Sequence, residues 1–173
     1  GDFSVSSPST WLIFSLIIRQ QKKRVIAYEE CFSIAQECGI DSRDELNETL
    51  WFLNTKVGLV RHFRGEGLEE LEEIVIIDPQ ILFDKITKLI VETFTFRKVT
   101  ADVHEEFRRK GIFPLSVLEQ LSSSDEDQLL TVSRLVKLLE RLHIIARLHS
   151  DSEEVKYFMP CSLAHAESTA PVL

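Results

Sequence analysis

Two segments of the chain carry the same pattern of apolar residues 86 positions apart, and this internal repeat constrains the fold more than any other feature. Residues 46–63 and 132–149 each have the pattern of a helix that runs into a strand. The shift of 86 aligns Leu46, Leu50, Leu53, Leu59, Val60 and Arg61 with Val132, Val136, Leu139, Ile145, Ala146 and Arg147. Each copy in such a repeat is one supersecondary unit. We therefore expect tandem small modules rather than one enzyme fold.

The order of the elements predicted in the first copy identifies the kind of module. Apolar periodicity and turn residues predict helices at 9–24, 28–38 and 41–57, and strands at 25–28, 59–63 and 74–77. Ser9 or Thr10 can cap the first helix, and Gly39 and Gly58 suit the left-handed residues that end the other two. A charged loop, 64–73, joins the last two strands. This is the order of elements in a winged helix: helix, strand, helix, helix, strand, loop, strand. The loop is the wing.

The same order begins again after Asp78-Pro79, a pair that can cap and open a helix. The second copy is predicted to contain helices at 79–94, 100–110, 115–121 and 128–142, and strands at 111–114, 144–148 and 155–159. The expected fold class is therefore α+β and mostly helical, with two tandem winged-helix modules. The expected domains are a linker or vector-derived segment at 1–8, a first module at 9–78, a second module at 79–163 and a flexible tail at 164–173.

Composition and charge narrow the functional classes. The chain has 173 residues, a formal net charge of −8 and a sequence pI of about 5.2, and this charge repels nucleic acid and anionic lipid. Its three cysteines are too few for a disulfide framework. Cys31 and Cys38 are predicted to share one face of a helix as packing residues. This use of cysteine favours a reducing, intracellular setting. The apolar run 11–18 is far too short to span a bilayer. Because no initiating methionine is present, we expect the chain to be part of a longer protein.

A winged helix that binds DNA usually presents basic residues on its third helix and in its wing, and the first copy does the reverse. Its third helix begins with Asp44-Glu45, and against Arg64 alone its wing carries Glu66, Glu69, Glu70, Glu72 and Glu73. In the second copy, basic residues lie on or near the third helix, namely Arg134, Lys137, Arg141 and Arg147. We interpret each charged group either as a solvated surface or as a contact for a partner of opposite charge.

The sequence contains neither of two glycine-rich phosphate-binding motifs, Gly-x-x-x-x-Gly-Lys-Ser/Thr and Gly-x-Gly-x-x-Gly. Its five histidines lack the short spacings of zinc ligands, and we expect them at the surface or at strand ends. Paired carboxylates such as Glu105-Glu106 lie in solvated runs, where nothing raises the pKa of one of them for acid catalysis. We therefore predict no catalytic, cofactor-binding or metal-binding residue. Helical spacing with apolar neighbours predicts that Trp11 and Trp51 lie in the core.

Several strings along the chain match the pattern of a known family. SPSTWL near the start is followed by RQQKKRVIAYEE, by LWFLNTKVGLVRHF and by IVIIDPQILFDKITKLI, and later by GIFPL and YFMPC. The most specific matches are Phe52-Leu53, Gly58, Phe63 and 76–82. From Pro8 to Leu163 the chain resembles the first half of the COR domain, the segment that follows the Roc GTPase in Roco proteins. It departs from that pattern at Ile81, where the family often has Trp.

The resemblance implies a cytoplasmic, multidomain signalling protein in which a Roc-type GTPase lies N-terminal to this segment. The segment itself would be a non-catalytic interaction and coupling module without a cofactor. It would relay the nucleotide state of the GTPase to neighbouring domains or to a dimer partner. The net charge and the short apolar run, for their part, predict no nucleic-acid partner and no membrane span. The second half of the COR domain, which carries much of the dimerisation, lies outside this chain. The resemblance also implies tandem winged-helix modules, in agreement with the internal repeat.

Exposed charges and aromatic residues are the candidate contacts with such protein partners. They are Arg19, Lys22 and Lys23 at the basic end of the first helix, Glu69, Glu70, Glu72 and Glu73 of the wing, Phe94 and Phe96, and Arg134, Lys137 and Arg141. Two other functions fit the same architecture. One is a winged-helix regulatory segment of a nucleotide-switch ATPase of the apoptotic or innate-immune type. The other is a DNA-binding winged-helix protein, which the charge disfavours.

Overall fold

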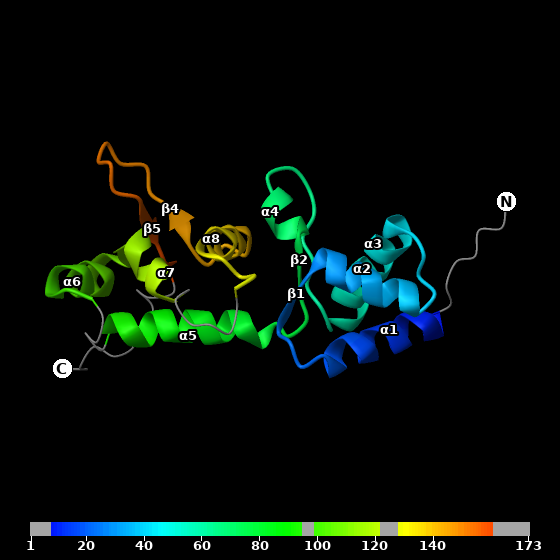
Figure 1. Ribbon diagram of the computed structural model, residues 1–173. Helices are drawn as coiled ribbons and strands as arrows, with labels where there is room; N and C mark the ends of the chain where they lie inside the picture. The colour runs from blue at the N-terminus through cyan, green and yellow to red at the C-terminus, as the bar shows by residue number, and fades with distance from the viewer. Residues whose placement is uncertain (1–7, 95–98, 122–127, 161–173) are drawn as a thin grey trace. The chain divides into compact units, whose positions relative to one another are not determined.

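The computed structural model describes residues 8–94, 99–121 and 128–160 (Figure 1). The chain divides into two compact units, Gly1–Ile81 and Leu82–Leu173. Among the described residues most ordered segments are helices, and each unit contains a small antiparallel sheet. The fold is therefore mixed and mostly helical, as predicted. Residues 122–127, which join two predicted helices, and the predicted tail at 164–173 lie outside the described residues.

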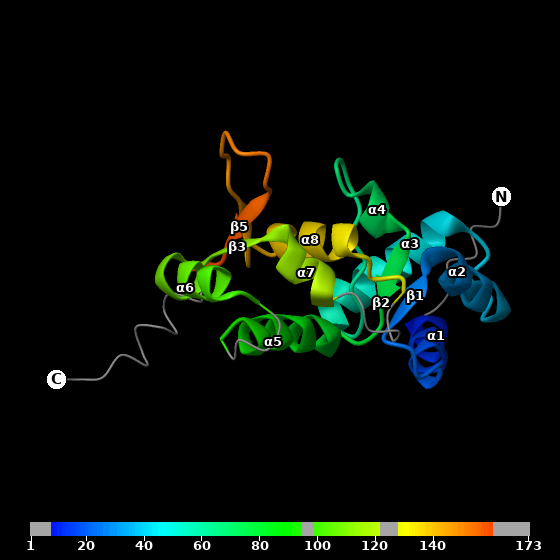
Figure 2. The ribbon, with the colours of Figure 1, turned by 60° about the vertical axis from the view of Figure 1, so that its left-hand side comes forward.

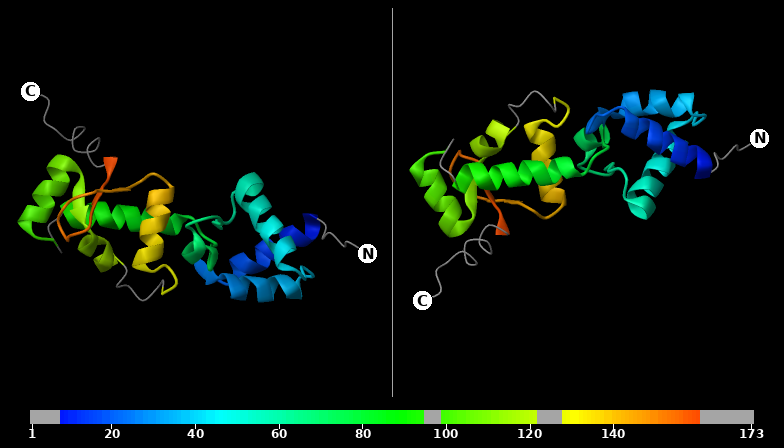
Figure 3. Two further views of the ribbon diagram at one scale, coloured as in Figure 1. Left: turned by 90° about the horizontal axis from the view of Figure 1, so that it is seen from above. Right: turned by 90° about the horizontal axis from the view of Figure 1, so that it is seen from below.

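The first unit is built from short helices around a small sheet. Its elements are α1 (Pro8–Gln20), β1 (Val25–Ala27), α2 (Tyr28–Glu37), α3 (Arg43–Phe52), the π-helical turn η1 (Leu53–Val57), α4 (Glu69–Glu72) and β2 (Ile74–Ile76). α1 packs against α2 (Figure 3). The fully buried members of the core include Phe14, Ile18, Ile26, Leu46 and Leu50. Cys31 belongs to this core and Cys38 packs against it, which confirms the prediction that both are packing residues.

Capping residues fix the third helix of this unit. The Ser42 hydroxyl accepts a hydrogen bond from the Glu45 amide at 3.1 Å, and so α3 begins inside the predicted range. Gly58 follows the π-helical turn with φ of +70°, a left-handed conformation that glycine adopts without a Cβ clash. The helical segment therefore ends at the predicted glycine.

The first helix differs from its prediction at both ends. It begins at Pro8, ahead of Ser9 and Thr10, and it ends at Gln20. Lys22 has φ of +57°, a left-handed conformation that cannot continue a right-handed helix. The basic residues from Lys22 onward therefore lie in a turn rather than on the helix.

The sheet of the first unit is smaller than predicted. β1 and β2 pair antiparallel with Val25 opposite Ile76, and Ile76 also forms an isolated bridge with Arg61. The predicted strand 59–63 is thus reduced to one bridged residue on the outer side of β2. The chain leaves the ladder directly after Arg61, where Nε2 of His62 lies 3.0 Å from the carbonyl oxygen of Glu72.

The second unit has a helix, α6, between its first helix and its first strand, where the described residues of the first unit have none. Its elements are α5 (Gln80–Phe94), which begins at the boundary, α6 (Ala101–Lys110), β3 (Ile112–Pro114), α7 (Leu115–Leu121), α8 (Val132–Arg141), β4 (Ala146–Arg147) and β5 (Lys156–Phe158). The antiparallel strands have the order β3-β5-β4. α7 packs against α8 and β3 (Figure 2). α8 begins later than predicted because Thr131 caps it, accepting a hydrogen bond from the Arg134 amide at 3.3 Å.

The two units repeat one arrangement of elements. In each, the last strand lies between the first strand and the residues that follow α3 or α8. One helix begins directly after the first strand of each unit. It is α2, which begins at Tyr28, in the first unit and α7, which begins at Leu115, in the second. The amide of that residue donates to the carbonyl just before the last strand, at 2.8 Å to Glu73 and at 3.0 Å to Val155. Tyr28 and Leu115 therefore occupy the same position.

The spacing of the repeat changes by one residue at the end of the matching helices. Gly58 and His143, which follow these helices, have left-handed φ of +70° and +59° and are 85 positions apart. Within the helices, three buried residues, Thr49, Leu50 and Leu53, match the buried Leu135, Val136 and Leu139 at 86. The π-helical turn before Gly58 absorbs the extra residue, because a π turn is an insertion into a helix. Past the helices, His62 rather than Arg61 therefore corresponds to Arg147, which corrects the sequence alignment of the two copies.

Candidate functional site

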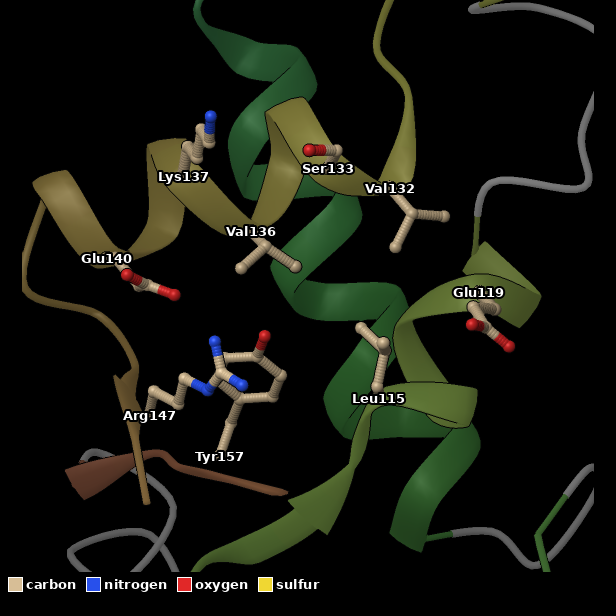
Figure 4. A pocket seen from close by; sticks show the side chains of 9 residues that line it. All are labelled: Leu115, Glu119, Val132, Ser133, Val136, Lys137, Glu140, Arg147 and Tyr157. Carbon is tan, nitrogen blue, oxygen red and sulfur yellow. The ribbon is translucent and has the colours of Figure 1, made fainter. Parts of the chain in front are cut away.

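A surface groove in the second unit lies between α7, α8 and the strands β4 and β5 (Figure 4). Its volume is about 510 Å³, within the range of sites that hold small ligands. The residues that line it are Leu115, Glu119, Val132, Ser133, Val136, Lys137, Glu140, Arg147 and Tyr157. The groove combines apolar side chains with charged groups of both signs, and it is the candidate docking site.

The floor of the groove is the end of a row of side chains that crosses the sheet. Phe113, Tyr157 and Arg147 lie opposite one another on β3, β5 and β4, so all three point to the same face. Phe113 is fully buried, and its ring centroid lies 6.1 Å from that of Tyr157, which is 4% exposed. Arg147, on the edge strand, is exposed. The row therefore runs from the core, through the ring of Tyr157, to the mouth of the groove.

The two helices supply the walls of the groove. Val132 and Val136 lie one turn apart on α8, and Leu115 is the first residue of α7. Figure 4 shows Val136 and Leu115 beside the ring of Tyr157. These three apolar side chains form a surface on which the nonpolar part of a ligand can be buried.

Tyr157, Glu140 and Arg147 form the polar end of the groove. Burial raises the pKa of the Tyr157 phenol, the Glu140 carboxylate raises it further, and the Arg147 guanidinium lowers it. The phenol is therefore protonated at neutral pH and can donate a hydrogen bond. Within the described part of the chain, these three polar groups make no hydrogen bond or ion pair with another side chain. A ligand in the groove can therefore use all three.

The structure separates the roles of the three basic residues predicted on α8. Lys137 lines the groove. Arg134 donates from Nη1 to the Leu129 carbonyl oxygen at 2.8 Å, and so holds the segment that precedes the helix. Arg141 is exposed and is not among the lining residues. Of these three, Lys137 alone lines the groove, together with Arg147, the basic residue predicted near the helix.

Most of the lining residues were not predicted as contacts from the sequence, among them Leu115, Glu140 and Tyr157. They come from α7, α8 and β5, and only the packing of both helices on the sheet brings them together. One signal for them exists in the repeat. The helix after the first strand begins with tyrosine in the first copy and with the smaller leucine in the second. This position lies next to α3 in the first copy and next to α8 in the second.

The predicted acidic wing holds part of its own backbone. Glu72 accepts a hydrogen bond from the Gly65 amide and Glu69 from the Gly67 amide, both at 3.1 Å. Leu71 is fully buried, and the segment forms the short helix α4 where an open loop was predicted. Glu72 is half-buried, whereas the exposed carboxylates of the wing are Glu66, Glu69, Glu70 and Glu73. A partner could therefore contact the wing through these exposed carboxylates.

The last turn of α1 and the segment after it present exposed cations and one ion pair. Arg19 and Lys22 are exposed. Lys23 pairs with Glu30 of α2, with Nζ 2.9 Å from Oε1. The predicted aromatic contacts, the side chain of Phe94 and the residue Phe96, lie outside the described residues.

Two predictions about single residues are wrong. Trp51 is 58% exposed rather than in the core, because the buried face of α3 is formed by residues 46, 49 and 50. His104, predicted at the surface or at a strand end, is buried on α6 with 7% exposure. Trp11 lies at the edge of the core, where its ring centroid is 5.1 Å from that of Phe52.

No three side chains of His, Cys, Asp or Glu among the described residues are grouped closely enough to bind a metal ion. No helix in the same ranges is both long enough and apolar enough to cross a bilayer. Burial raises the pKa of the Cys31 thiol to about 12, so this thiol is a packing group and not a nucleophile at neutral pH.

The chain thus consists of two repeated units of helices on small antiparallel sheets, and the second unit contains a groove. The model of the family "C-terminal of Roc, COR-A domain" matches residues 8–163. The chain belongs to this family and is a Roc-associated COR domain of Roco type. This confirms the resemblance found in the sequence.

A solved structure has a similar fold. The structure of Methanosarcina barkeri Roco2 RocCORdC bound to GDP matches this chain with a TM-score of 0.59 and 18% sequence identity. The match covers 89% of this chain and 43% of that one, so the chain spans less than half of the length of that structure. No curated protein matches the sequence.

Proposed function

We propose that this chain is a non-catalytic interaction and coupling module of a Roco-like multidomain signalling protein. It relays the nucleotide state of an adjacent Roc-type GTPase to neighbouring domains or to a dimer partner, in the cytoplasm and without a cofactor of its own. The observation that carries the proposal is the COR-A match, which extends over residues 8–163 and so over both units.

Both units act as winged-helix modules in this proposal. The order of elements supports this, since each unit has a strand, two helices and a returning hairpin-like segment whose last strand lies in the middle of the sheet. α6 is an addition to the second module. The acidic wing of the first module opposes the DNA binding that many winged helices perform.

Coupling requires surfaces that a GTPase contacts differently in its two states. The described residues offer exposed cations after α1, exposed carboxylates in the wing, and a mixed groove in the second unit. Surfaces of different charge favour different partner faces. The two modules can therefore hold contacts with two partners, and a change in one contact biases the arrangement of the larger protein.

The affinity of this chain for the Roc-type GTPase of the same protein, measured in the GDP state and in the state with a GTP analogue, tests the proposal. We expect the two affinities to differ by about fivefold or more, because allosteric couplings are typically ~1–3 kcal/mol. Equal affinities in the two states would contradict a coupling role.

A charge reversal locates the contact. Lys22→Glu changes an exposed residue in the turn after α1, and we expect weaker association with the GTPase at low salt. Arg109→Glu is the matched control, because it reverses an exposed charge on α6, outside the predicted contacts. Equal losses in the two variants would mean that net charge, and not a contact at Lys22, governs the association.

A further inference from the structure

We propose that the groove of the second unit binds an aromatic side chain of tyrosine type that belongs to a partner polypeptide. This inference rests on the proposed function as an interaction module, and it adds the chemistry of the segment that the module recognises. It follows from a comparison of the two repeats. The space that corresponds to the groove is filled in the first unit by the protein's own Tyr28.

The first unit shows how this fold holds a tyrosine at that position. The hydroxyl of Tyr28 donates to Oδ1 of Asn47 on α3 at 2.7 Å. Its ring stacks on the imidazole of His62, with centroids 5.3 Å apart and planes 20° from parallel. The guanidinium of Arg43 lies 5.6 Å from the centroid of the same ring. The tyrosine is therefore held by a hydrogen bond to the third helix and by stacking groups.

The counterparts of these residues line the groove in the second unit. Leu115 stands at the position of Tyr28, as the matching backbone hydrogen bonds show. Ser133 lies 86 positions after Asn47, on the matching helix. Arg147 stands at the position of His62, and all three residues line the groove. Since leucine and serine are shorter than tyrosine and asparagine, the place of the tyrosine is open.

The larger floor residue of the second unit does not close this space. Val75 on β2 corresponds to Tyr157 on β5, because each lies opposite the middle residue of the first strand of its unit. That residue is Ile26 in the first unit and Phe113 in the second. The ring of Tyr157 is already buried in the floor, with 4% exposure, and the groove above it retains about 510 Å³. The space is therefore available to a side chain from outside.

The polar end of the groove suits an aromatic ring that carries a hydroxyl. The guanidinium of Arg147 can stack on the face of such a ring. The Glu140 carboxylate can accept a hydrogen bond from a phenol, and the Tyr157 phenol can donate one. An aliphatic side chain would cover the floor but would leave these polar groups without a partner. The groove therefore favours tyrosine over leucine.

A titration of the 173-residue chain with N-acetyl-tyrosinamide, followed by the amide shifts of isotope-labelled protein, tests the proposal. We expect saturable shifts at Ser133, Val136 and Arg147, with a dissociation constant on the order of 1 mM for one isolated side chain. N-acetyl-leucinamide is the matched probe, and we expect it to bind at least about threefold more weakly. The titration contains no GTPase and no nucleotide, so its failure is distinct from a failure of the coupling proposal.

Variants assign the binding to the groove. Arg147→Ala changes an exposed edge residue and weakens binding by about three- to fivefold, the size expected for the loss of one cation–π contact. Leu115→Tyr restores the filling residue of the first unit and abolishes the saturable shifts. Arg141→Ala, a control on the same helix, removes an exposed cation outside the groove and leaves binding unchanged.

Any of four results would overturn the proposal. The first three are equal binding of the tyrosine and leucine probes, shifts that map outside the groove, and a folded Leu115→Tyr variant that binds like the parent chain. Free tyrosine that binds tenfold more tightly than its capped amide would also overturn it, by assigning the groove to an amino-acid ligand. If Leu115→Tyr does not fold, the comparison of Arg147→Ala with Arg141→Ala decides the outcome, because both change exposed side chains.

Discussion

At the scale of single residues, side-chain size decides whether the same position of the repeat is closed or open. Tyr28 fills the position in the first unit, and Leu115 leaves a groove in the second. The surrounding backbone hydrogen bonds are the same in the two units. At this position the difference between the units therefore lies in the side chains.

Removal of one hydroxyl tests how firmly Tyr28 is held. Tyr28→Phe loses the hydrogen bond to Asn47, and we expect the free energy of unfolding, measured by urea denaturation, to fall by about 1 kcal/mol. Tyr157→Phe is the control, because its hydroxyl forms no hydrogen bond within the described ranges, and we expect a change within about 0.5 kcal/mol. Equal losses would show that the Asn47 bond does not stabilise the first unit.

His62 makes the stability of the chain depend on pH. Burial lowers the pKa of His62, and the hydrogen bond to the Glu72 carbonyl opposes this shift in part. The unfolded chain, with a histidine pKa of about 6.5, therefore binds this proton more readily than the folded chain does. The contribution of His62 to the free energy of unfolding is complete above that pKa. It is lost as pH falls through it toward the lower folded-state value.

Denaturation midpoints measured between about pH 5 and pH 8 check this dependence. We expect His62→Gln, which keeps an N–H donor for the Glu72 carbonyl, to lose less stability on acidification than the parent chain. His149→Gln removes an exposed histidine and should follow the parent profile. A His62→Gln profile that matches the parent would mean that His62 does not cause the acid sensitivity.

At the scale of elements, local signals located the helices better than the strands. α7 lies at the predicted residues 115–121, and Ser42 caps α3 within the predicted range. Helices are set by contacts a few residues apart, which a sequence displays directly. The predicted strand 59–63 became one bridge, because its length depends on how far a distant partner continues beside it. α4 was missed because its stability comes from the buried side chain of Leu71.

The wing offers a test at the same scale. Glu72→Ala removes the acceptor of the Gly65 amide, and we expect faster hydrogen exchange at Gly65 with a loss of roughly 0.5–1 kcal/mol in stability. Glu70→Ala is the control, since it removes an exposed carboxylate of the same helix, and the Gly65 amide should exchange as before. Equal exchange rates in the two variants would rule out Glu72 as the group that closes the loop.

At the scale of the whole molecule, charge separates this chain from winged helices that bind DNA. The net charge is −8, and the first wing is acidic. We expect no tight, salt-sensitive binding in a titration with random duplex DNA at low salt, followed by fluorescence anisotropy. A dissociation constant that rises steeply with salt concentration would show a phosphate-binding surface that the charge distribution does not predict.

The repeat, most helix positions, the acidic character and the family follow from the amino-acid sequence alone, because local strings and apolar periodicity display each of them. Tertiary structure decided which charged side chains hold the backbone, such as Arg134, which donates to the Leu129 carbonyl, and Glu72, which accepts from the Gly65 amide. It also decided the groove, which joins residues from α7, α8 and the strands β4 and β5. A groove is the volume that packed side chains leave empty, and that volume depends on neighbours that are distant in sequence.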